Sequence, residues 1–111
     1  MYTGRFLECV VARLLDASFP QFGISPWDLI LRDGTRIEVR SGASSFSLKG
    51  PKNVDLWVFV HKLQPEAPFS VATAGDVAAL GVGSIRATKL AARFERVGPS
   101  DLAARVAAAR A

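Results

Sequence analysis

The chain has 111 residues, of which half are hydrophobic and 22% are charged, and its formal net charge at pH 7 is +4. This composition supplies enough apolar side chains for one folded domain and excludes a wholly disordered chain. A single cysteine cannot form an internal disulfide, and one cysteine with one histidine cannot build a Cys/His zinc site. Because no apolar run approaches the ~20 residues that cross a bilayer and no signal-peptide pattern is present, we expect a cytoplasmic protein with no membrane partner.

Residues 5–17 carry apolar side chains at helical spacing, which predicts an amphipathic helix. Glu8 lies at the border of the apolar face, where it can reach around the edge of a core. Two interpretations of Glu8 stay open. It is either a functional carboxylate or the partner of Arg5 in a surface ion pair, three residues back. The segment Phe19–Pro26, with two prolines and a glycine, is predicted to be a loop.

The sequence from Trp27 to Ser41 predicts a β-hairpin that turns at Asp33-Gly34. A two-residue turn gives neither face of this hairpin a consistent character. A three-residue loop with Gly34 in the left-handed conformation places apolar residues on one face, namely Trp27, Leu29, Leu31, Ile37 and Val39. The other face then carries Asp28, Ile30, Arg36, Glu38 and Arg40. Because the buried face sets the register, we expect the three-residue loop, in which Asp28 lies directly opposite Glu38.

After the hairpin, residues 41–53 are small, polar and basic, which indicates a loop with a short strand at Phe46–Leu48. The run DLWVFVHKL (55–63) is almost continuously apolar and predicts a central strand that is covered on both faces. Pro65 and Pro68 end this strand, and a short strand over Phe69–Ala72 follows.

The C-terminal part is predicted to be mainly helical. Thr73 and Asp76 form a capping-box pattern that opens a brief helix. Ser84 is expected to cap a second helix that runs to about Phe94. Gly98-Pro99-Ser100 then begins an Ala-rich helix to the end of the chain.

These elements predict one α/β domain over 1–111, a small mixed β-sheet of four or five strands flanked by helices. Within it we distinguish a core over 1–63 and a helical, basic C-terminal region over 64–111. The basic and acidic residues from Met1 to Gly83 balance, so the whole net charge lies between Ser84 and Ala111. A basic C-terminal segment on an otherwise neutral chain indicates an anionic partner, and it favours nucleic acid over a membrane surface.

The predicted pairing of Asp28 with Glu38 is the main candidate for chemistry. Two carboxylates on one face, about 5 Å apart between Cβ atoms, repel unless a proton or a cation lies between them. Such a pair suits a hard divalent ion such as Mg²⁺, and Arg40 adds a fixed positive charge on the same face. The competing interpretation is a solvated hairpin face, on which Asp28, Arg36, Glu38 and Arg40 form ion pairs of little net value.

The arrangement as a whole resembles the PD-(D/E)xK nuclease superfamily over about residues 5–61. The resemblance is carried by a helix with a glutamate, Pro26-Trp27-Asp28, a nine-residue gap, Glu38-Val39-Arg40-Ser41 and the strand DLWVFVH. It implies a restriction-endonuclease-like core in αβββ-β order, metal ligation by Asp28 and Glu38, and an auxiliary role for Glu8. Two positions depart from the family pattern. Trp27 separates the proline from the aspartate, and Arg40 stands where the family has its lysine.

Arg40 keeps the positive charge of that lysine and can bind a phosphate, but an arginine does not act as a base. If a lysine from another position supplies the ammonium group of the missing motif lysine, Lys49 and Lys52 are the candidates. A second basic group, Arg86, Lys89, Arg93 and Arg96, falls within an arc of about 80° if one helix continues past Phe94. Such a stripe is either a phosphate-binding row or a solvated helix face. With Lys49 and Lys52, these four residues are the candidate nucleic-acid contacts.

The sequence therefore predicts a Mg²⁺-dependent (or Mn²⁺-dependent) endonuclease-like protein that acts on DNA. In that prediction Asp28 and Glu38 hold the metal ion and Arg40 holds the scissile phosphate. A second hypothesis is a non-catalytic protein that keeps the nuclease fold to bind nucleic acid or a protein partner. A third is a small oligomerisation domain with incidental charge. Because a chain of this size has little surface for a duplex, we expect a homodimer or a larger complex.

Overall fold

A mixed four-stranded sheet with the strand order β1-β2-β4-β5 organises the computed structural model, which describes residues 4–19, 28–50, 53–81 and 83–110. The strands are β1 (Leu29–Ile30), β2 (Arg36–Gly42), β4 (Leu56–His61) and β5 (Phe69–Thr73). β1 is antiparallel to β2, β2 is parallel to β4, and β4 is antiparallel to β5. The expected α/β class with a small mixed sheet is confirmed.

Helix α1 (Gly4–Leu15) is the predicted amphipathic helix, and it ends two residues earlier than the sequence pattern suggested. Asp16 takes the left-handed conformation at φ 53°. The amide of Ala17 then donates to Ala12 O at 2.9 Å, and that of Asp16 donates to Arg13 O at 3.4 Å. These two bonds form a Schellman motif, which satisfies carbonyls that the helix end leaves open. The short polar side chain of Asp16 tolerates this conformation better than most residues do.

The β1–β2 hairpin has the predicted three-residue loop. Leu31 N donates to Thr35 O at 2.8 Å, and Leu29 pairs with Ile37. Gly34 has φ +92°, a conformation that favours glycine. The described apolar residues of the first predicted face, Leu29, Leu31, Ile37 and Val39, are buried in one cluster, so the register is confirmed. Pro26 and Trp27, together with most of the predicted 19–26 loop, lie outside the described residues.

The central strand and the elements after it also agree with the sequence pattern. All six residues of β4 are buried, as a strand covered on both faces requires. Helix α2 (Ala74–Leu80) begins with the predicted capping box. Thr73 Oγ1 accepts from Asp76 N at 3.0 Å, and Asp76 Oδ2 accepts from Thr73 N at 3.1 Å.

The expectation that Ser84 caps a helix is wrong. Ser84 begins strand β6 (Ser84–Arg86), which pairs antiparallel with β3 (Ser45–Ser47). The pairing buries Phe46 against Ile85, and this apolar contact outweighs the local capping preference of Ser84. Helix α3 (Ala87–Arg93) starts only after this strand and ends before Phe94, whose backbone is extended.

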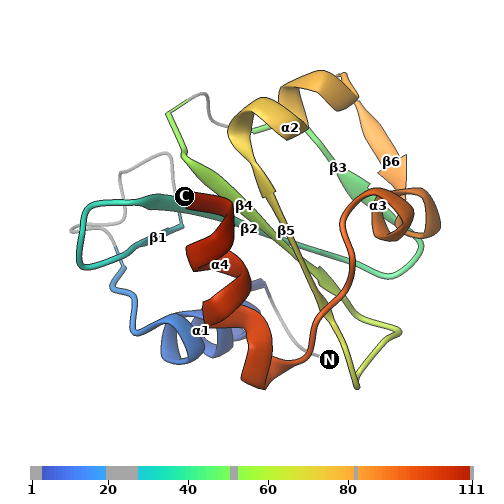
Figure 1. Cartoon of the computed structure of the whole chain (residues 1–111). Coiled ribbons are helices and arrows are strands. Elements are labelled where there is room, and N and C mark those ends of the chain that lie inside the picture. Colours follow the sequence, from blue (N-terminus) through green and yellow to red (C-terminus); the bar gives the residue numbers. More distant parts are fainter. Residues whose placement is uncertain (1–3, 20–27, 51–52, 82, 111) are drawn as a thin grey trace.

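Two hydrophobic clusters occupy the two faces of the four-stranded sheet. The helices that cover these faces can be followed in Figure 1. Helices α1 and α4 (Leu102–Arg110), the second preceded by the 3₁₀ turn η2 (Pro99–Asp101), cover one face. The β3–β6 pair, α2 and α3 cover the other. Val11, Val58 and Leu102 belong to the same cluster, so residues before and after position 63 share one core. No helix in the described part of the chain is long and apolar enough to span a bilayer.

Candidate carboxylate and arginine site

Asp28 and Glu38 meet at the open end of the β1–β2 ladder. Asp28 lies one residue beyond the Leu29–Ile37 pair, and its amide donates to Ile37 O at 3.0 Å. Its carboxylate turns back to β2, where Oδ2 accepts from Val39 N at 2.8 Å. Because side chains alternate along a strand, Glu38 and Arg40 project from the face opposite Ile37 and Val39. The predicted opposition of Asp28 and Glu38 therefore places the Asp28 carboxyl group close enough to raise the pKa of Glu38.

Glu38 is only 6% exposed. Its pKa is raised to about 7, first by burial and then by charge repulsion from Asp28 and a hydrogen bond with it, against the opposing effect of Arg40. Near neutral pH Glu38 is therefore protonated for part of the time. The interpretation of this face as a solvated surface does not apply at Glu38, because the side chain is out of water.

Arg40 is held by three groups on three different segments. Its Nη2 lies 2.7 Å from Glu38 Oε2 and donates to Lys49 O at 2.5 Å. Its guanidinium lies 5.3 Å from the centre of the Trp57 ring, within cation–π range. Its Nε is buried with no hydrogen-bond partner in the described residues. The guanidinium is thus positioned next to Glu38 and has a donor to spare.

The loop after β3 lies directly over this arginine. A Cβ atom on Gly50 would lie 2.7 Å from Arg40 Nη2 and 2.7 Å from Trp57 Cη2, which is closer than real Cβ contacts. Gly50 therefore lets the backbone pass over the guanidinium. Sequence reasoning singled out Lys49 for its side chain, but the described contact is made by its carbonyl. Trp57, which was expected to be core, is buried and also supports Arg40.

Glu8 is not brought into this group. Asp28 and Arg40 are the charged groups that act on the pKa of Glu38, and Glu8 is not among them. Helix α1 packs on the opposite face of the sheet, where Val10 and Val11 join the cluster around Val39. Within the described residues no set of three acidic, histidine or cysteine side chains could hold a metal ion. The auxiliary role of Glu8 receives no support from this geometry.

The predicted basic stripe on one helix face is wrong. Arg86 belongs to strand β6, while α3 ends at Arg93. Arg96 lies beyond the helix, where its Nη1 donates to Ala67 O at 2.9 Å. The chain cannot continue as a helix because Phe94 is extended and partly buried against the second cluster. Lys49, Arg86, Lys89 and Arg93 are exposed, and Lys52 lies outside the described residues.

A buried polar pair that the sequence did not reveal links β4, β5 and the segment after α3. Ser70 Oγ donates to Phe94 O at 2.9 Å and lies 2.9 Å from His61 Nε2. Because the hydroxyl hydrogen goes to the carbonyl, the histidine Nε2–H donates to the serine. Burial, helped by the charge of Arg96, lowers the pKa of His61 to about 4. A neutral histidine that donates to the serine does not activate it as a nucleophile, so this pair is structural.

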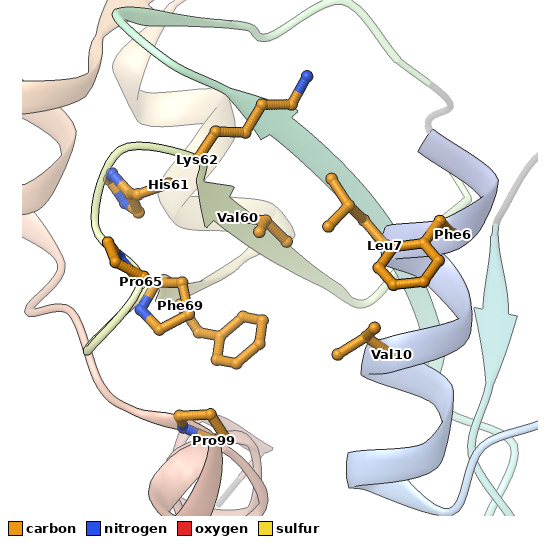
Figure 2. Close-up of a pocket in the computed structure, with 10 residues that line it drawn as sticks. Phe6, Leu7, Val10, Val60, His61, Lys62, Pro65, Phe69 and Pro99 are labelled. Carbon is orange, nitrogen blue, oxygen red and sulfur yellow. The ribbon is translucent and has the colours of Figure 1, made fainter. Parts of the chain in front are cut away.

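The described structure also has an apolar cavity of about 390 Å³ between α1 and the β4–β5 turn. Figure 2 shows Phe6, Leu7 and Val10 facing Val60 and Phe69 across it. The Lys62 amino group points away from these side chains. The cavity lies on the α1 face of the sheet, whereas Glu38 and Arg40 project from the other face. It adds no chemical group to the candidate site.

The donor set of the site fits a hard divalent cation. Two adjacent carboxyl groups supply oxygen ligands, and Mg²⁺ commonly binds through one or two carboxylates with water in its other positions. Asp28 and Glu38 would hold the cation, and the proton that burial favours on Glu38 would compete with it.

No protein-family model matches the chain, and a search of curated proteins finds no significant match. The functional interpretation therefore rests on the residues and the geometry of the site.

Proposed function

We propose that this protein is a Mg²⁺- or Mn²⁺-dependent, endonuclease-like phosphodiesterase that acts on DNA. The observation that carries the proposal is the placement of the Asp28 carboxylate, held by Val39 N, beside the buried Glu38, with the Arg40 guanidinium 2.7 Å from Glu38. Two neighbouring carboxylates repel each other, and a cation between them relieves the repulsion. The resemblance to PD-(D/E)xK nucleases, in which these positions match the metal-binding acids, agrees with this proposal.

Each residue has a distinct role in the proposed reaction. Asp28 and Glu38 bind the metal ion, which when bound activates water and neutralises charge on the phosphate. Arg40 contacts the phosphate through donors that Glu38 and Lys49 leave free. Trp57 and the Lys49 carbonyl fix the guanidinium, so little side-chain freedom is lost when the phosphate binds.

The second candidate function is nucleic-acid or partner binding without catalysis, and one observation favours it. Arg40 Nη2 lies between Glu38 Oε2 and Lys49 O, so the guanidinium already occupies one carboxylate oxygen. An arginine at this place partly neutralises Glu38 and competes with a metal ion for it. In this function the pair of acids and the arginine stabilise the fold, and the chain binds its partner elsewhere.

A nicking assay on supercoiled plasmid with Mg²⁺ or Mn²⁺ tests the proposal. The wild type is compared with Glu38→Ala, Arg40→Lys and Glu66→Ala, the last being an exposed acid outside the site. We expect wild type and Glu66→Ala to nick the plasmid, Glu38→Ala to lose all activity, and Arg40→Lys to lose most of it. The loss in Arg40→Lys follows from removal of the guanidinium fork, which an ammonium cannot reproduce.

Two outcomes would overturn parts of this proposal. If no variant nicks DNA with either metal, the second candidate function replaces the first. If Arg40→Lys nicks faster than wild type, Arg40 obstructs the metal site instead of binding the phosphate. Circular dichroism of each variant shows that its fold is intact.

A further inference from the structure

Two segments of the chain, residues 42–54 and 77–94, hold five of the fourteen basic residues and none of the ten acidic ones. They are far apart in sequence, yet the β3–β6 pairing joins them on one side of the molecule (Figure 1). No ion pair is found for Lys49, Arg86, Lys89 or Arg93 within the described residues. Within the part of the chain that the structure describes, the charges of these four residues are therefore not compensated by ion pairs.

The β3–β6 ribbon presents a uniform outward face. Phe46 and Ile85 point into the core, so their neighbours on each strand point outwards. Ser45 lies opposite Arg86 and Ser47 lies opposite Ser84, and all four are exposed. The outward face thus consists of three hydroxyl groups and one guanidinium.

Further backbone bonds hold the ribbon in this register. Leu48 N donates to Gly83 O at 2.7 Å at one end, and Ala87 N donates to Ser44 O at 2.8 Å at the other. Helix α3 continues from Arg86 with Lys89 and Arg93 exposed. The ribbon and this helix present their cations from a rigid framework, which reduces the entropy lost on binding.

The chemistry of this face selects one kind of partner. Serine hydroxyls, arginine and lysine are the groups that contact the phosphates of a duplex. Single-strand binding surfaces add exposed aromatic rings for base stacking, but the aromatic residue of the ribbon, Phe46, is buried. Membrane-surface elements insert apolar side chains, and the outward face of the ribbon has none.

We propose that the outward face of the β3–β6 ribbon, together with Lys49, Lys89 and Arg93, binds the phosphate backbone of a nucleic-acid duplex. The assignment to nucleic acid rests on the proposed function, because the ribbon adjoins the candidate site. Lys49 follows β3 directly, and its carbonyl accepts from Arg40 Nη2. A backbone on this face therefore runs beside Arg40. The interface replaces the single helical stripe that the sequence suggested, and it excludes Arg96.

Fluorescence anisotropy with a labelled duplex of about 20 base pairs, in EDTA and without metal, tests this interface. Binding then depends on neither metal nor cleavage, so its result is independent of the nicking assay. The test variant is the double substitution Arg86→Ala with Lys89→Ala. The matched control is Arg13→Ala with Lys62→Ala, which removes the same charge from two exposed residues outside the ribbon and outside α3.

We expect log K to fall with log [salt] with a slope of about −3 or steeper in wild type and in the control. The test variant should bind at least tenfold more weakly at low salt, with a slope shallower by about 2. A single strand of the same length should bind more weakly than the duplex. DNA and RNA duplexes are compared in separate arms, because both present the same phosphate chemistry.

Three results would overturn the proposal. These are equal losses in the two double variants, no binding to either duplex at low salt, and binding to anionic phospholipid vesicles in place of duplex. If the expected binding pattern is found while the plasmid remains uncut, the interface stands and the catalytic function fails.

Discussion

The backbone amide of Val39 donates to Oδ2 of Asp28 across 2.8 Å, so a side-chain carboxylate serves as acceptor at the open end of the β1–β2 ladder. This bond holds the Asp28 carboxylate beside Glu38. One contact therefore links the strand pairing to the geometry of the candidate site.

Loss of this acceptor should destabilise the protein. Asp28→Ala leaves the Val39 amide without its partner, whereas Asp28→Asn keeps a side-chain oxygen at the same place. We expect Asp28→Ala to lower the free energy of unfolding by about 1–2 kcal/mol more than Asp28→Asn does. Urea denaturation measures both variants, and equal stabilities would show that this hydrogen bond contributes nothing.

The pH dependence of stability should report the buried Glu38. Its pKa is about 7 in the folded state and near 4.5 when unfolded, so the folded state binds the proton more tightly. Its contribution to stability is full below pH 4.5 and is lost as the pH rises through 7. Glu38→Gln imitates the protonated form and removes this titration. Relative to wild type the variant should gain stability as the pH rises from 4.5 to 7, by up to about 1.4 kcal/mol per pH unit, with no further gain above 7.

Denaturation of wild type and Glu38→Gln over that range, with Glu66→Gln as the exposed control, measures this difference. A difference between wild type and Glu38→Gln that does not change with pH would contradict the raised pKa.

The buried His61 should act in the opposite direction. Its pKa is about 4 in the folded state against 6.5 ordinarily, so the unfolded state binds the proton more tightly. Its contribution to stability is full above pH 6.5 and is lost as the pH falls towards 4. His61→Gln should reduce the decrease in the free energy of unfolding between pH 6.5 and 4. Urea denaturation at several pH values measures it. An unchanged dependence would show that His61 is not buried in its neutral form.

Gly34 in the β1–β2 loop and Gly75 in helix α2 provide a matched pair of alanine substitutions. Gly34 has φ +92° and Gly75 lies in the first turn of α2. Gly34→Ala should cost about 1–2 kcal/mol because its backbone conformation is strained for alanine, although there is space for the Cβ. Gly75→Ala should stabilise the protein by about 0.4–1 kcal/mol. Thermal denaturation compares them, and equal effects would mean that the loop relaxes to a negative φ.

The hairpin register could be predicted because only one choice of loop length makes one face of the hairpin consistently apolar. Leu29, Leu31, Ile37 and Val39 fixed the side of the sheet on which Asp28 and Glu38 lie. The capping box at Thr73 was predictable for a similar reason, since its signal is local.

The elements that depend on distant partners could not be predicted in this way. Ser84 is a good helix cap by local preference, but its segment pairs with β3, some forty residues earlier in the chain. The contacts of Arg40 with Lys49 O and Trp57 depend on the parallel β2–β4 pairing and on a loop that crosses it. The Ser70–His61 bond joins neighbouring strands, and no spacing pattern marks it.

The central claim is that Asp28 and Glu38 together form one divalent-cation site, and isothermal titration with Mn²⁺ at about pH 8 tests it most directly. Wild type, Asp28→Asn and Glu38→Gln are titrated, and circular dichroism confirms that each is folded. We predict one saturable site in wild type, at least tenfold weaker binding in each variant, and weaker binding to wild type at pH 6, where a proton on Glu38 competes with the ion. Equal binding in all three proteins, or no binding heat in wild type, would contradict the claim.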